Sequence, residues 1–178
     1  MLNYTSALMR TKYKTKEYIK MGLDMYLFKC KKAAYESGNR AEISAAFKKG
    51  LRSYWYREKP KNSPSMVCWR YANQVYRWLL EHTDVDVNSE DYVKISRHEI
   101  LSLLQTCHMV LNTGIDDNGT PKQSVCEKLL PTMDGPNFGE LEYNEFYVEQ
   151  VRETFDDVQA LFESVDFENE VLLFDAWW

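Results

Sequence analysis

Apolar residues recur at helical spacing in several parts of the chain and in short extended runs elsewhere. The helical spacing predicts helices over residues 41–56, 66–81, 97–113, 124–130 and 144–164. Helix 97–113 is the most clearly marked, because Ser96 and Glu99 form a capping-box pattern before it and Gly114 follows it. Apolar and aromatic runs predict strands over residues 21–29, 92–95 and 170–177.

These elements predict an α+β fold, helix-dominated, with a small antiparallel sheet of about three strands. The chain has 178 residues, of which 44% are hydrophobic, so it can form one packed domain. We predict that this single domain spans residues 21–178. Residues 1–20 are basic and lack a strong apolar stripe, and they are interpreted as an N-terminal extension.

The pattern also predicts specific packing. We expect Met25, Leu27 and Leu173 to lie in one sheet and to pack against the helix around residues 100–111. In helix 66–81, Trp69 and Asn73 are four residues apart and should share one face, with the Asn73 amide bridging backbone groups of nearby loops. Trp78 should pack on the sheet. The acidic helix 144–164 should bury the stripe Phe146, Val151, Phe155, Val158, Leu161 and Phe162.

Charge is distributed unevenly along the chain. Residues 1–70 contain 16 Lys or Arg against 5 Asp or Glu, whereas residues 139–178 contain 12 acidic residues and only Arg152 as a cation. Two interpretations stay open: the two ends neutralise each other, or one of them faces a charged partner.

The sequence indicates no catalytic residues, metal site or cofactor. It lacks the GxGxxG, GxxxxGK[ST], GxSxG and HExxH patterns, and its four cysteines stand apart and are expected to be buried. Its apolar runs are far shorter than the roughly 20 residues of a membrane span, and the N-terminus has no apolar signal region, which predicts a cytoplasmic protein without membrane contact. An enzyme whose catalytic residues are scattered in sequence remains an open alternative.

Two segments are candidate binding surfaces. Glu145, Glu149, Glu153 and Asp156 follow i, i+4, i+8, i+11 spacing along a ridge roughly 17 Å long, with Asp157 and Glu163 nearby. Such a row of carboxylates can imitate a phosphate backbone, although an acidic helix face is often only solvated. The second candidate is Arg52, Trp55 and Arg57, where a ring could stack on bases and arginines bind phosphates, unless the aromatic residues belong to the core.

Three motifs, in order, resemble a family of uncharacterised phage and prophage proteins. They are MGLDMYL at 21–27, WRYANQVYRW at 69–78, and an LLPT, FG and YNEFY block at 129–132, 138–139 and 143–147. The resemblance covers residues 21–178, but this chain has Tyr76 where the family usually has histidine, and Pro136-Asn137 where it has a run of phenylalanines. The resemblance implies a phage origin.

Combined with the acidic helix, the resemblance leads to a functional prediction. The protein is expected to be a non-enzymatic binding protein that inhibits a host defence nuclease or its guide complex, as an anti-CRISPR protein does. The alternative is a phage accessory protein that binds nucleic acid through its basic, aromatic N-terminal part.

Overall fold

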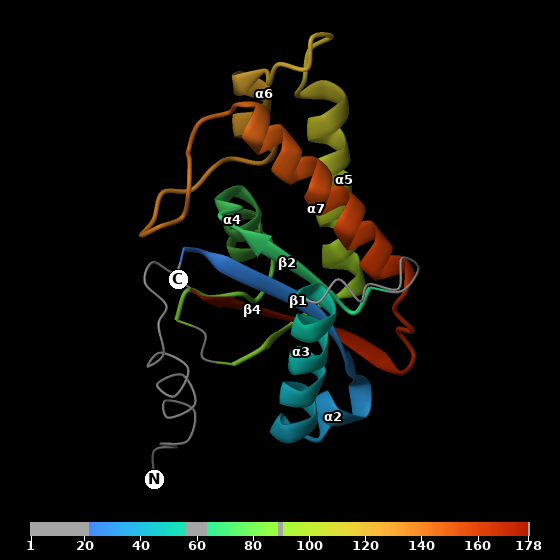
Figure 1. Ribbon diagram of the computed structural model, residues 1–178. Helices are drawn as coiled ribbons and strands as arrows, with labels where there is room; N and C mark the ends of the chain where they lie inside the picture. Colours follow the sequence, from blue (N-terminus) through green and yellow to red (C-terminus); the bar gives the residue numbers. More distant parts are fainter. Residues whose placement is uncertain (1–21, 56–63, 89–90, 178) are drawn as a thin grey trace.

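The computed structural model describes residues 22–55, 64–88 and 91–177 (Figure 1). In chain order the elements are β1 (Asp24–Lys31), α2 (Lys32–Glu36), α3 (Arg40–Trp55), β2 (Met66–Arg70), α4 (Asn73–His82), β3 (Val93–Ile95), α5 (Arg97–Thr113), α6 (Gln123–Leu129), α7 (Glu145–Glu163) and β4 (Glu170–Trp177). The strands form one antiparallel sheet in the order β2-β1-β4-β3. The predicted α+β, helix-dominated class is confirmed, with four strands in the described residues instead of about three.

The additional strand is β2, which lies where the sequence predicted the first turns of helix 66–81. It pairs with β1, with Trp69 opposite Met25 and Val67 opposite Leu27. The chain then turns at Tyr71, whose φ of 60° is a left-handed conformation that neither a strand nor a right-handed helix uses. Helical apolar spacing across residues 66–81 is thus divided between a strand and helix α4, because pairing with a distant strand overrides the local pattern.

Both faces of the sheet are covered by helices (Figure 1). Met25 and Leu27 of β1 belong to the larger core with α4, α5, α6 and α7, whereas Tyr26 and Phe28 pack with Ile43 and Phe47 of α3 on the other face. Side chains of a strand alternate between faces, so each central strand is apolar on both sides.

Met25 and Leu27 lie in the same core as the buried residues of α5, in line with the prediction, but the predicted packing of Leu173 is wrong. Leu173 lies opposite Phe28 in the register of β1 and β4, and it belongs to the core beneath α3. Its neighbours Leu172 and Phe174 face the α5 side instead. The cause is strand alternation, which a continuous apolar run conceals.

Helix α5 forms as its local sequence predicts. The Ser96 hydroxyl accepts a hydrogen bond from the Glu99 backbone N–H, and the Glu99 carboxylate accepts one from the Ser96 N–H. The helix packs against α7, where the His108 and Phe155 rings lie 5.9 Å apart and the Arg97 guanidinium lies 5.7 Å from the Phe162 ring. No helix in the described part of the chain is long and apolar enough to cross a membrane. The predicted extension, residues 1–20, lies outside the described residues.

Candidate functional site

Helix α7 is fixed in the molecule along one side. Asn144 caps its start, because the side-chain oxygen accepts a hydrogen bond of 3.1 Å from the Tyr147 N–H. Further along, the Trp69 indole donates to the Thr154 hydroxyl at 3.0 Å, and the Gln150 amide donates to the Arg70 carbonyl at 3.1 Å. The buried positions are Tyr147, Val148, Gln150, Val151, Thr154, Val158 and Leu161. The opposite side of the helix is therefore presented to solvent in a defined orientation.

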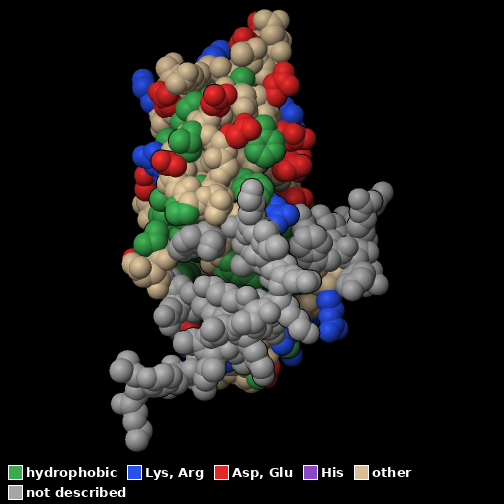
Figure 2. All heavy atoms as spheres, turned by 60° about the vertical axis from the view of Figure 1, so that its left-hand side comes forward, with side chains coloured by type: hydrophobic (Ala, Val, Ile, Leu, Met, Phe, Trp, Pro, Cys, Tyr) green, Lys and Arg blue, Asp and Glu red, His purple; other side chains and the backbone are tan. Residues whose placement is uncertain are grey.

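The predicted acidic ridge lies on that exposed side. Glu145, Glu149, Glu153 and Asp156 are exposed, and Asp157 is half-buried at the ridge's margin. Glu140 and Glu142 in the preceding loop are exposed as well. Figure 2 shows Asp and Glu side chains gathered over the upper, helical part of one face of the molecule, with hydrophobic side chains among them. The structure thus brings the acidic candidates together on one surface, hereafter the acidic ridge (Glu145, Glu149, Glu153 and Asp156).

Phe146 lies outside the buried stripe of α7 in which it was predicted. It was expected in the buried stripe of α7, but it is 44% exposed. The buried stripe runs through Tyr147, Val151 and Val158, and Phe146 lies about 100° around the helix from Tyr147, outside that stripe. Together with Asn144, Glu145 and Glu149, Phe146 lines an open hollow of about 600 Å³. The sequence contained a signal for this exposure, because Phe146 does not belong to the i, i+4 series that Tyr147 and Val151 form.

The exposed cations of α3 and the acidic ridge of α7 lie on opposite sides of the sheet. Helix α3 exposes Lys48, Lys49 and Arg52, and it covers the face of the sheet opposite to the one covered by α7. The ion pairs among the described residues are Arg40–Asp91, Arg70–Asp24 and Arg77–Glu81. None of these three pairs joins residues 22–70 to residues 139–177.

The basic aromatic candidate is only partly described. Arg52 is exposed in the last turn of α3. The Trp55 side chain and Arg57 lie outside the described residues, so whether the three side chains meet remains a prediction.

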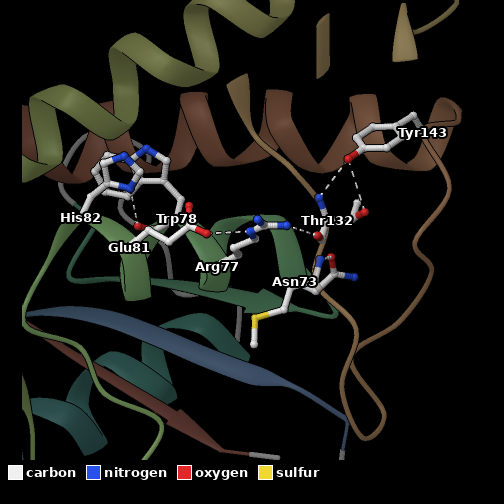
Figure 3. Close-up of polar contacts among 8 residues, drawn as sticks. Asn73, Arg77, Trp78, Glu81, His82, Thr132 and Tyr143 are labelled. Atoms are coloured by element: carbon white, nitrogen blue, oxygen red, sulfur yellow. Dashed lines mark hydrogen bonds and ion pairs between the residues drawn. The ribbon is translucent and has the colours of Figure 1, made fainter. Parts of the chain in front are cut away.

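Residues of the second and third sequence motifs meet around the start of α4 (Figure 3). Asn73 is 1% exposed, and its amide donates to the carbonyls of Phe138 and Glu140 at 3.1 and 2.9 Å. Its side-chain oxygen accepts from the Met133 N–H at 2.9 Å. The predicted bridging role of Asn73 is confirmed, but its predicted shared helix face with Trp69 is wrong because Trp69 lies in β2.

The same loop is held at two further points. Arg77 donates to the Thr132 carbonyl at 3.0 Å and pairs with Glu81 at 2.8 Å, and the Tyr143 hydroxyl accepts from the Thr132 N–H at 3.1 Å (Figure 3). Gly139 has a φ of 97°, and a Cβ there would lie 2.8 Å from the Tyr71 Cβ. These contacts show that the motif residues hold the loop after α6 against α4.

The histidines occupy separate places. His82 stacks on Trp78, which is buried in the larger core, at a ring distance of 4.6 Å, and its Nδ1 lies 2.8 Å from the Trp78 carbonyl. His108 lies beside Phe155, and His98 is exposed in the first turn of α5. In the part of the chain that the structure describes, no three His, Cys, Asp or Glu residues lie together as metal ligands would.

The thiols differ in burial. Cys30, Cys107 and Cys126 are buried as expected, and Cys68 is only half-buried. Burial raises the pKa of the Cys107 thiol to about 12 and also raises the pKa values of Cys30 and Cys126.

Comparisons with protein-family models, curated proteins and solved structures gave no match to this chain.

Proposed function

We propose that this protein is a non-enzymatic binding protein whose acidic ridge occupies a basic, nucleic-acid-binding surface of a partner protein. The observation that carries the proposal is the ridge itself: four exposed carboxylates in a row on a helix whose other side is anchored to β2 and the core. Successive members are three or four residues apart, so they are spaced by about 5–6 Å. Proteins bind the nucleic-acid backbone largely through Lys and Arg, and a pre-ordered row of negative charges competes for those cations.

The partner that we propose is a host defence nuclease or its guide complex. The protein would inhibit this partner in the way that an anti-CRISPR protein does. This part of the proposal depends on the resemblance to phage proteins, and its physical support is the charge complementarity between the ridge and a nucleic-acid channel.

The test is a capture experiment in a bacterial host that carries such a nuclease. The tagged protein is purified with and without nuclease treatment, and a defence protein that stays bound after treatment is the expected result. Charge reversal of Glu149, Glu153 and Asp156 to Lys should abolish capture. The matched control reverses Glu36, Asp117 and Glu168, which are exposed and outside the ridge, and so changes the net charge equally. Capture that survives reversal of the ridge would overturn the proposal.

A second candidate function follows from the exposed cations of α3. Lys48, Lys49 and Arg52 could contact phosphates, which favours the nucleic-acid-binding accessory protein. In that case the captured material is nucleic acid, it is lost after nuclease treatment, and reversal of these three residues to Glu removes it while reversal of the ridge does not.

A further inference from the structure

We infer that the hollow beside Phe146 binds an arginine side chain of the basic partner, an inference that rests on the proposed function and specifies its chemistry. The first observation is the exposure of an aromatic ring. Phe155 and Phe162 of the same helix pack against the core, whereas Phe146 stands outside it and is 44% exposed. An exposed phenylalanine costs hydration free energy in the unbound protein and gains it when a partner covers the ring.

The second observation is the arrangement around the ring. Phe146 and Glu149 are three residues apart, and Glu145 and Glu149 are four apart, so each pair consists of neighbours on the helix surface. All three side chains line the same open hollow of about 600 Å³. The hollow therefore combines an aromatic surface with two carboxylates, and a ligand that enters it meets both.

This combination selects the chemistry of the occupant. A neutral apolar group would cover the ring but would also remove water from the two carboxylates without pairing them, which is unfavourable. A cation satisfies both, since it is attracted to the face of the ring and to the carboxylates. Glu140 adds a further exposed carboxylate beside the hollow, where it accepts a hydrogen bond of 2.9 Å from the Asn144 side chain, and the exposed Arg152 lies one turn beyond Glu149.

Between the two cationic side chains, the geometry favours arginine. Its planar guanidinium can lie on the Phe146 ring and direct N–H groups in a fork to a carboxylate, whereas the lysine ammonium is a compact and strongly hydrated charge. Carboxylates alone can also pair with the guanidinium fork, so the hollow is identified by the part of the arginine preference that the Phe146 ring contributes. We therefore expect the ridge to prefer arginine over lysine, and we expect that preference to depend on Phe146.

The test uses fluorescein-labelled peptides of ten arginines and of ten lysines, with binding to the full chain measured by fluorescence anisotropy at two ionic strengths. We expect the wild-type protein to bind the arginine peptide about two- to fivefold more tightly than the lysine peptide. Phe146→Ala and Phe146→Leu should both lower this ratio, since leucine keeps an apolar surface but has no ring, while the preference that the carboxylates contribute remains. Leu141→Ala is the matched control, because Leu141 is 43% exposed in the preceding loop, and it should leave the ratio unchanged.

Equal binding of the two peptides by the wild-type protein would overturn the inference, and so would a ratio that Phe146→Leu preserves. Circular dichroism melting of each variant checks that the fold is intact, which an exposed position should allow. The two proposals fail separately. If the two peptides bind equally but capture depends on the ridge, the proposed function is supported and the arginine site is not. If the arginine preference depends on Phe146 but capture does not depend on the ridge, only the arginine site is supported.

Discussion

The indole N–H of Trp69 in β2 donates a hydrogen bond of 3.0 Å to the hydroxyl of Thr154 in α7, and both residues are buried. The bond joins an edge strand of the sheet to the middle of the acidic helix, 85 residues away in sequence. Gln150 adds a second link one turn earlier, through the Arg70 carbonyl. Together with the buried side chains of α7, these two links hold the rotation of the helix about its axis and hence the direction in which the acidic ridge points.

Replacing Thr154 by Val should test the first link. Valine has nearly the same shape but no acceptor, so the indole N–H is left buried without its partner, and the free energy of unfolding should fall by about 1–3 kcal/mol in a urea titration. Thr154→Ser keeps the hydroxyl and should recover part of this loss. A valine variant as stable as the wild type would show that the bond contributes little.

Asn73 should be essential to the loop that follows α6. Asn73→Ala removes a donor group for two carbonyls and the acceptor for the Met133 N–H, and we expect it to lower the free energy of unfolding by at least about 2 kcal/mol. Hydrogen exchange at the Met133 amide should accelerate at the same time. Asn112→Ala serves as the control, because Asn112 is exposed and bonds only within its own helix. A fully stable but inactive Asn73 variant would point to a direct functional role instead.

Helix α5 offers a matched pair of leucines. Leu104 is 9% exposed and Leu101 is 45% exposed. Leu104→Ala should lower the free energy of unfolding by about 2–5 kcal/mol, as the loss of buried methyl groups does, and Leu101→Ala should change it by less than about 0.5 kcal/mol. Thermal melting of both variants checks the assignment of the buried face, and equal losses would contradict it.

The cysteines should react in the order of their exposure. The thiolate is the reactive form, and at mildly alkaline pH burial keeps Cys107 protonated because its pKa is raised to about 12. With a thiol-specific chromogenic disulfide, the half-buried Cys68 should react in the native protein, while Cys107 reacts only after unfolding in urea. Peptide mapping by mass spectrometry identifies the modified site. Early modification of Cys107 would mean that the α5–α7 interface opens readily.

Local sequence was sufficient where an element's own residues stabilise it. Helix α5 begins where Ser96 and Glu99 satisfy each other's backbone N–H groups, and these contacts span only three residues. The acidic ridge was also predictable, because i, i+4 spacing places carboxylates on one side of any helix that forms. The bridging role of Asn73 could be anticipated from its amide chemistry, although its partners, more than 60 residues away, could not.

Only the tertiary structure decided features that depend on distant partners. Residues 66–70 have helical spacing but form a strand, because β1 supplies hydrogen-bonding partners that the local pattern does not reveal. Leu172 and Leu173 are neighbours in the same apolar run, and alternation along β4 places them on opposite faces of the sheet, each of which is covered by different helices. Phe146 is as hydrophobic as Phe155, yet it is exposed because the buried stripe through Tyr147, Val151 and Val158, together with the Trp69 and Gln150 links, turns another side of α7 toward the core. The sequence by itself determined the charges and their spacing along α7, whereas long-range contacts determined that these charges and the Phe146 ring face solvent together.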